Sequence, residues 1–173
     1  MNLSSKIRSI PDFPKKGIVF RDITTLLQDP RAYEHTIDQF CTYFARHRIT
    51  KVGVVESRGF IFGGPIALQL GVGIVPIRKK GKLPWDTVRQ TYKLEYGTDS
   101  LEIHKDAVTK RDRVLIIDDL LATGGTAKAS VKLIEKLGAT VAGLGFLIEL
   151  SFLNGRDKLK DYEVLTLVQY DSE

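Results

Sequence analysis

The sequence predicts an α/β protein built on an open, mainly parallel twisted sheet flanked by helices. Five short apolar runs lack the polar alternation of half-exposed strands, which is typical of strands buried on both faces. These runs are Val52–Val55, Gly73–Ile77, Val114–Ile117, Val141–Ile148 and Val164–Val168. Helical segments separate several of them, and this alternation favours a parallel sheet. In such sheets ligands bind beyond the carboxyl ends of the strands, so the residues that follow each run are candidates for chemistry.

Length and composition predict one domain that spans residues 1–173. At about 100–200 residues per domain, the chain is long enough to bury a single core. Hydrophobic residues make up 43% and charged residues 27%, close to globular averages, which excludes a disordered or low-complexity chain. The single cysteine, Cys41, excludes an intrachain disulfide and a cysteine-based zinc site, and it is typical of a reducing compartment.

The net charge leaves three classes of partner open. Lys and Arg number 26 against 21 Asp and Glu, so the formal net charge is +5. This excess is compatible with a nucleic-acid surface, an acidic partner or a polyphosphate substrate, and composition does not separate them. His35, His47 and His104 have no metal-like spacing, and we assign them no role.

No segment has the pattern of a targeting signal or of a membrane-spanning helix. The first residues lack the apolar core of a signal peptide. The uncharged stretch 59–77 contains five glycines together with Pro65, Pro76 and Gln69, so it is better read as a helix, a turn and a strand than as a transmembrane helix. We therefore expect a cytoplasmic protein.

Local signals place the helices between the apolar runs. Asp29 and Pro30 are typical of an N-cap and a first helical position, and apolar residues at helical spacing continue to about Arg46. Cys41 lies in that apolar stripe, which predicts a buried thiol rather than a nucleophile. Further helices are expected over 59–70 and 125–137, the latter ending at Gly138.

The segment between Arg78 and Lys105 breaks this pattern. A long polar loop is followed by short alternating stretches at 91–96 and 101–104. We expect this insert to form a mobile covering segment or an antiparallel hairpin rather than part of the core.

One motif combines two acids with a glycine turn. Val114–Ile117 leads directly to Asp118 and Asp119, and Thr123-Gly124-Gly125-Thr126 then opens a helix. Such a turn directs backbone N–H groups and hydroxyls at a positive helix end, where they can hold a phosphate dianion. Carboxylates just before it suit sugar hydroxyls or the hydration shell of a metal. An N-capping turn with surface acids is the alternative, which the whole string from Val114 to Thr126 disfavours. No Gly-Lys-Ser/Thr follows, so the motif is not a P-loop.

The string from Val114 to Thr126 resembles the phosphoribosyl-diphosphate motif of the type I phosphoribosyltransferases. The resemblance implies the fold of that family, with the acids on the ribose hydroxyls and the turn on the 5′-phosphate. It also implies Mg²⁺ as a cofactor, which Asp118 and Asp119 contact only through water or the ribose. The residues that the resemblance places on the phosphoribosyl group are Asp118, Asp119, Ala122, Thr123, Gly124, Gly125 and Thr126.

Four other segments resemble the adenine phosphoribosyltransferases, collinearly from about Ile10 to Glu149. They are Phe13–Thr24, Glu56–Phe60, Arg78–Pro84 and Leu94–Asp99. The first implies that the backbone of Val19 and Arg21 meets the edge of adenine while Phe20 stacks on the ring; an edge strand in the core is the alternative for this run. The resemblance also implies a small amino-terminal hood over about residues 1–35.

The same resemblance assigns the diphosphate group and the base. It implies that Glu56, Ser57 and Arg58 form the diphosphate loop, with Arg58 catalytic, and that Arg78, Lys79 and Lys82 neutralise the diphosphate. In related enzymes the arginine at the position of Arg78 reaches across a dimer interface, so the resemblance predicts a homodimer. A flexible flap over about 79–104 would carry Tyr96, which contacts substrate, and Glu95, the expected catalytic group for the proton of the base; a surface acid is the alternative for Glu95. Trp85 departs from the small or polar residue expected there.

The sequence therefore predicts an enzyme that transfers a phosphoribosyl group to adenine and yields AMP and diphosphate, with no nucleic-acid or membrane partner. Two alternatives remain open. One is transfer to guanine, hypoxanthine or xanthine, and the other is a non-catalytic relative that binds nucleic acid through its basic surface.

Overall fold

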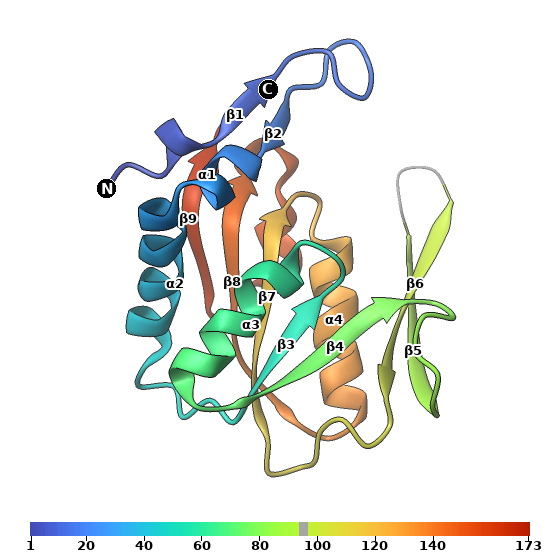
Figure 1. Ribbon diagram of the computed structural model, residues 1–173. Coiled ribbons are helices and arrows are strands. Elements are labelled where there is room, and N and C mark those ends of the chain that lie inside the picture. The colour runs from blue at the N-terminus through green and yellow to red at the C-terminus, as the bar shows by residue number, and fades with distance from the viewer. Residues whose placement is uncertain (94–96) are drawn as a thin grey trace.

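The computed structural model describes residues 1–93 and 97–173, and its main sheet carries helices on both faces (Figure 1). Within those ranges, seven strands lie in the order β5-β6-β4-β3-β7-β8-β9. The strands are β3 (Lys51–Val55), β4 (Gly73–Lys79), β5 (Thr87–Lys93), β6 (Thr98–His104), β7 (Arg113–Leu121), β8 (Thr140–Leu150) and β9 (Val164–Tyr170). Neighbouring strands in the part of the sheet ordered β4-β3-β7-β8-β9 are parallel. Strand β6 runs antiparallel to both of its neighbours, β4 and β5. The predicted fold class is confirmed.

Both faces of the sheet are apolar because the buried strands send alternate side chains to opposite cores. On β7, Leu115 and Ile117 belong to one cluster, while Val114 and Ile116 belong to the other. Helices α2 (Pro30–Phe44) and α3 (Gly59–Leu70) cover the first face, and α4 (Gly125–Lys136) covers the second. This double covering explains why the strand runs lack polar alternation.

Helix α2 begins as its sequence predicts. Asp29 is the N-cap, and its side chain accepts hydrogen bonds from the backbone N–H groups of Arg31 at 3.1 Å and Ala32 at 3.2 Å. The helix ends at Phe44, before the expected Arg46. Cys41 is buried, and burial raises the pKa of its thiol to about 11, so the thiol is not activated as a nucleophile.

The insert forms the predicted hairpin, but the expectation that it lies outside the core is wrong. Strand β6 pairs with β4 through Arg78↔Glu102 and Lys79↔Leu101, which extends the main sheet. Leu101 and Ile103 are buried in the same cluster as α4. The short polar alternation of this segment reflects an edge hairpin with one buried face.

The amino-terminal segment forms a separate small layer beyond the carboxyl ends of β7, β8 and β9 (Figure 1). Strands β1 (Arg8–Ile10) and β2 (Phe20–Asp22) pair antiparallel, with a short 3₁₀ helix η1 (Ser4–Lys6) before them and α1 (Thr24–Gln28) after them. The end of the chain touches this layer, since the Val19 N–H donates to the Glu173 carboxylate at 2.8 Å. No helix in the described part of the chain is long and apolar enough to cross a membrane.

A buried ion pair joins β8 to the segment that follows it. Glu149 is 4% exposed, and Arg156 donates to its two oxygens from Nε at 3.0 Å and from a terminal nitrogen at 2.5 Å. Arg156 belongs to the 3₁₀ helix η3 (Gly155–Leu159), which follows η2 (Ser151–Leu153). The Arg156 hydrogen bond, supported by the Thr166 hydroxyl, lowers the pKa of Glu149 despite its burial.

We predict that Arg156→Met lowers the free energy of unfolding at pH 7, because it leaves the buried Glu149 charge unpaired. The expected loss is about 2 kcal/mol, below the value for a fully buried pair since the Arg156 side chain is 42% exposed. Denaturant unfolding measures it. Lys160→Met breaks the exposed Lys160–Asp157 pair and serves as the control, with a change within about 0.5 kcal/mol.

The same ion pair has a pH signature. The folded pKa of Glu149 lies below its unfolded value, so its stabilisation is present above about pH 4.5 and is lost as the pH falls through the folded pKa. Glu149→Gln should therefore remove part of the fall in stability below pH 4.5. An unchanged acid limb in Glu149→Gln would contradict the assignment.

Candidate active site

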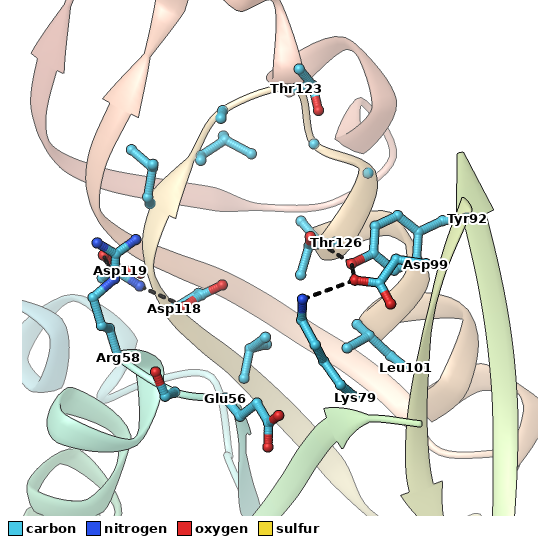
Figure 2. Close-up of a pocket in the computed structure, with 18 residues that line it drawn as sticks. Glu56, Arg58, Lys79, Tyr92, Asp99, Leu101, Asp118, Asp119, Thr123 and Thr126 are labelled. Atoms are coloured by element: carbon cyan, nitrogen blue, oxygen red, sulfur yellow. Dashed lines mark hydrogen bonds and ion pairs between the residues drawn. The ribbon is translucent and has the colours of Figure 1, made fainter. Parts of the chain in front are cut away.

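A cavity of about 540 Å³ lies at the carboxyl ends of β3 and β7. The chain proceeds from β3 to β4 on one side of β3 and returns to β7 on its other side, so the cavity lies where the strand order reverses. The predicted residues that line it are Glu56, Ser57, Arg58, Lys79, Asp118, Asp119, Ala122, Thr123, Gly124, Gly125 and Thr126. Segments distant in sequence are thus brought together as the sequence predicts (Figure 2).

The two acids lie within β7 rather than after it, because this strand continues to Leu121. Asp119 is 4% exposed and pairs with Arg58, with 2.8 Å between its Oδ2 and the arginine Nε. Its backbone N–H donates to Asp118 Oδ1 at 2.9 Å. Gly59 allows α3 to start this close, since a Cβ there would lie 2.8 Å from the Ile117 carbonyl oxygen.

Burial controls the protonation of the acid pair. It raises the pKa of Asp118 well above the ordinary aspartate value, and the adjacent Asp119 charge raises it further. Burial also raises the pKa of Asp119, while the Arg58 guanidinium opposes that rise. Because two neighbouring carboxylates are poorly solvated here, hydroxyl donors or a cation that reaches them is favoured.

The turn from Ala122 to Thr126 packs against Gly155, a glycine that the sequence does not single out. Gly124 has φ +74°, and a Cβ on it would lie 2.4 Å from the Gly155 carbonyl oxygen. A Cβ on Gly155 would lie 2.0 Å from the Ala122 carbonyl oxygen. Lys158 donates from Nζ to the Thr123 carbonyl at 2.7 Å. The η3 segment therefore supports the turn from behind, and the Asn154-Gly155 dipeptide signals only a turn.

The N-terminus of α4 forms part of the cavity wall. Helix α4 begins at Gly125, so the free N–H groups of its first turn lie in the wall of the cavity together with the Thr126 side chain. This is the anion-binding geometry of a helix N-terminus.

Opposite the acids, a second polar group lines the cavity (Figure 2). Lys79 Nζ lies 3.0 Å from Asp99 Oδ2, and this contact raises the pKa of Lys79 and lowers that of Asp99. The Thr126 hydroxyl donates to the Tyr92 hydroxyl at 3.4 Å, which donates to Asp99 at 3.4 Å. Neither Asp99 nor Tyr92 is singled out by the sequence, because their meeting depends on the hairpin register.

Several predicted residues do not line this cavity. Arg78 turns to Glu56, with which it forms an ion pair, and to the Lys82 carbonyl oxygen at 3.1 Å. The Lys82 side chain is also absent from the lining.

The predicted base-binding residues Val19, Phe20 and Arg21 lie at or beside β2, outside the cavity lining. Their nearest link to it is the Arg58 guanidinium, 5.8 Å from the centre of the Phe20 ring. The predicted Glu95 and Tyr96 lie outside the described residues.

The donor set fits a magnesium ion that arrives with a phosphorylated ligand. In the parts of the chain that the structure describes, no cluster of three or more His, Cys, Asp or Glu side chains offers a complete metal site. Asp118 and Asp119 nevertheless present two adjacent carboxylates to the cavity. Mg²⁺ typically binds through one or two carboxylates plus water and substrate phosphates, so this pair is sufficient for that mode.

Taken together, the groups are chemically suited to a phosphorylated sugar that carries a further phosphate group. Carboxylates can accept hydrogen bonds from hydroxyls, and the N–H groups at the start of α4 can donate to a phosphate. Arg58, beside Asp119, and Lys79, on the opposite wall, supply positive charge. These features lie in one pocket at the reversal of strand order.

Known proteins are similar to this chain in sequence and in fold. The model of the phosphoribosyl transferase domain matches residues 26–172. An adenine phosphoribosyltransferase of Clostridium perfringens is 59% identical over 171 residues, which is 99% of each chain. The crystal structure of an adenine phosphoribosyltransferase from Thermoanaerobacter pseudethanolicus superposes with a TM-score of 0.94 at 52% identity, covering 97% of this chain and 98% of that one.

A third match is a Saccharomyces cerevisiae adenine phosphoribosyltransferase, crystallised with an imino-altritol bisphosphate and adenine. It has a TM-score of 0.90 at 42% identity, and the match covers 95% of this chain and 96% of that one. The acid pair, the glycine turn and these full-length matches lead to one conclusion: the chain belongs to the phosphoribosyl transferase family.

Proposed function

We propose that the protein transfers the 5-phosphoribosyl group of 5-phosphoribosyl 1-diphosphate to adenine, giving AMP and diphosphate. The observation that carries the proposal is the Asp118–Asp119 pair, held in one cavity with the Ala122–Thr126 turn. The choice of adenine rests on relatives of that name, which match the chain over nearly its whole length at 42–59% identity.

The phosphoribosyl group would bind along β7 and the turn that follows. The carboxylates of Asp118 and Asp119 accept hydrogen bonds from the ribose hydroxyls, while the N–H groups at the start of α4 and the Thr123 and Thr126 hydroxyls hold the 5′-phosphate. This fixes the anomeric carbon opposite the cations and converts its reaction with the base into a step between positioned groups.

Negative charge grows on the diphosphate as its bond to the anomeric carbon breaks. Arg58 and Lys79 line the cavity and would stabilise this charge electrostatically, with Arg78 and Lys82 supplying further positive charge nearby. Ser57 and Glu56 complete this loop. Mg²⁺, held by the diphosphate and by Asp118 and Asp119 through water or the ribose, would add charge neutralisation when bound.

The base would enter from the amino-terminal layer, which we propose to be a hood over about residues 1–35. Phe20 would stack on adenine while the backbone of Val19 and Arg21 reads its edge. The flap predicted over residues 79–104 would be restricted to the part of the hairpin outside the core, since Leu101 and Ile103 are buried. It would carry Tyr96 to the substrate and Glu95 to the proton of the base, and its closure would exclude competing water.

We further propose that the enzyme works as a homodimer in the cytoplasm. On α3, Ile61 is 39% and Leu68 is 83% exposed, and their spacing of seven residues places them on one helix face. Ile74, at the start of β4, is 50% exposed. An exposed apolar face of this kind is typical of a protein interface. The lone buried Cys41 suits a reducing compartment.

Leu68→Glu places a charge in the centre of the proposed interface and should shift the sedimentation coefficient from dimer to monomer. Because Leu68 is exposed in the single chain, its thermal unfolding transition should remain cooperative. Gln69→Ala shortens the neighbouring exposed side chain without adding a charge and should leave the dimer intact. A wild-type protein that sediments as a monomer at micromolar concentration would refute the dimer.

The direct test of the function is nucleotide formation from each purine. Protein, Mg²⁺ and 5-phosphoribosyl 1-diphosphate should yield AMP from adenine, with far less product from guanine, hypoxanthine or xanthine, as measured by chromatography. A preference for an oxo-purine would move the assignment to another purine transferase. No nucleotide from any base, together with salt-sensitive RNA or DNA binding, would favour the nucleic-acid regulator.

Asp119→Asn should lower kcat/KM on the order of 100-fold, since it removes a charged acceptor aimed at the ribose and unpairs Arg58. The melting temperature should change little, because neutralising one of two adjacent buried carboxylates also relieves their repulsion. Steady-state kinetics and thermal unfolding measure the two effects. Asp157→Asn, which alters an exposed acid, is the matched control, and turnover near that of the wild type in Asp119→Asn would exclude the ribose role.

A further inference from the structure

Lys79 faces the cavity already paired with a carboxylate. Its Nζ lies 3.0 Å from Asp99 Oδ2, and both residues line the cavity (Figure 2). They come from different strands, Lys79 from the end of β4 and Asp99 from the start of β6. Asp99 precedes Leu101 by two residues, just outside the backbone contacts of β6 with β4, which extend to the Lys80 N–H donating to the Ser100 carbonyl at 3.2 Å. The ion pair therefore adds a side-chain link between the hairpin and the main sheet beside this pairing.

A carboxylate at this place opposes binding of a polyphosphate. The cavity would receive a diphosphate group, and a negative charge on its wall repels that group unless the charge is neutralised. Lys79 neutralises Asp99, but the same ammonium is then not fully available to the ligand. Asp99 also keeps part of its side chain accessible, at 25%, and that of Lys79 is 59% accessible, so water screens their attraction and exchange of partners is easy.

We propose that Asp99 is an internal counter-ion, which holds Lys79 in the free enzyme and releases it to the diphosphate group of the substrate. This inference rests on the proposed function and adds a positioning residue to it. In the free state the pair keeps the flexible lysine side chain extended into the cavity, so less conformational freedom is lost when the substrate binds. The diphosphate then replaces one carboxylate as the partner of Lys79.

Tyr92 connects this exchange to the phosphate turn. Its hydroxyl donates to Asp99 at 3.4 Å and accepts from Thr126 at 3.4 Å, and Tyr92 lies directly opposite Asp99 in the β5–β6 ladder. When Lys79 leaves, Asp99 keeps the Tyr92 hydroxyl as a donor and is not stranded without a partner. The hairpin thereby keeps its contact with the α4 turn and its backbone pairing with β4, and only the side-chain link from Asp99 to Lys79 is exchanged.

We predict that Asp99→Asn strengthens binding of the diphosphate group. Removing the competing charge frees Lys79, so KM for 5-phosphoribosyl 1-diphosphate should fall by about three- to five-fold, the size of a partly exposed ion pair. Inhibition by the product diphosphate should strengthen by a similar factor. KM for adenine at saturating 5-phosphoribosyl 1-diphosphate should not change, whereas a merely structural defect would raise KM for both substrates.

A double-mutant cycle tests whether the effect acts through Lys79. Lys79→Gln alone should raise KM for 5-phosphoribosyl 1-diphosphate, and adding Asp99→Asn to it should then change KM by a clearly smaller factor than in the wild type. Asp106→Asn is the matched control, because Asp106 is an exposed acid in the turn after β6, outside the proposed flap and the cavity lining. It should leave both KM values unchanged.

Two results would overturn the counter-ion role. One is a raised KM for 5-phosphoribosyl 1-diphosphate in Asp99→Asn, and the other is an equal fall in KM with and without Lys79. If added Mg²⁺ relieved the raised KM, Asp99 would instead be a contact for the hydrated metal.

A binding measurement separates this proposal from the proposed reaction. Calorimetric titration with inorganic diphosphate and Mg²⁺ should show tighter binding to Asp99→Asn than to the wild type, whichever base the enzyme uses. If the wild type makes AMP while this affinity does not increase, only the counter-ion role fails. If diphosphate binding tightens but no nucleotide forms, the reaction fails and the counter-ion role stands.

Discussion

The ion pair between Arg58 and Asp119 connects two of the segments that build the site. Arg58 follows β3, Asp119 lies in β7, and these strands are neighbours at the reversal of the sheet order. Since Asp119 is almost fully buried, its charge depends on this partner, and Gly59 allows the helix after Arg58 to approach β7 closely. This contact therefore links the acid pair, the predicted diphosphate loop and the start of α3.

The phosphate turn depends on packing of backbone against backbone. Gly124 and Gly155 approach so closely that neither has room for a Cβ, and Gly155 precedes Arg156, whose buried partner is Glu149 on β8. The residue that packs behind the turn is thus the direct neighbour of one that is held by a buried carboxylate on β8. The packing of the turn is therefore continuous with the ion pair that joins β8 to η3.

The cations of the site are balanced before any substrate arrives. Arg58 pairs with Asp119, Arg78 with Glu56 and Lys79 with Asp99. A net charge of +5 suggests an attractive surface for any polyanion, yet locally each of these cations has an acidic partner. Under the proposed function, a ligand would bind here by exchanging partners, which would favour one that offers both phosphates for the cations and hydroxyls for the carboxylates.

The fold class, the main strands and most of the cavity lining follow from local sequence. Buried strands need continuous apolar runs, and a phosphate turn needs glycines and hydroxyls at the start of a helix, so Val114 to Thr126 carries its own signal. Gly155, Asp99 and Tyr92 carry no such signal, because their roles arise from contacts with residues far away in the chain. The pairing of β6 with β4, which buries Leu101 and Ile103, is likewise a matter of sheet register. The sequence by itself determined which chemical groups the site contains, and the tertiary structure alone decided which charge faces which, since distance and burial set the strength of every charge pair.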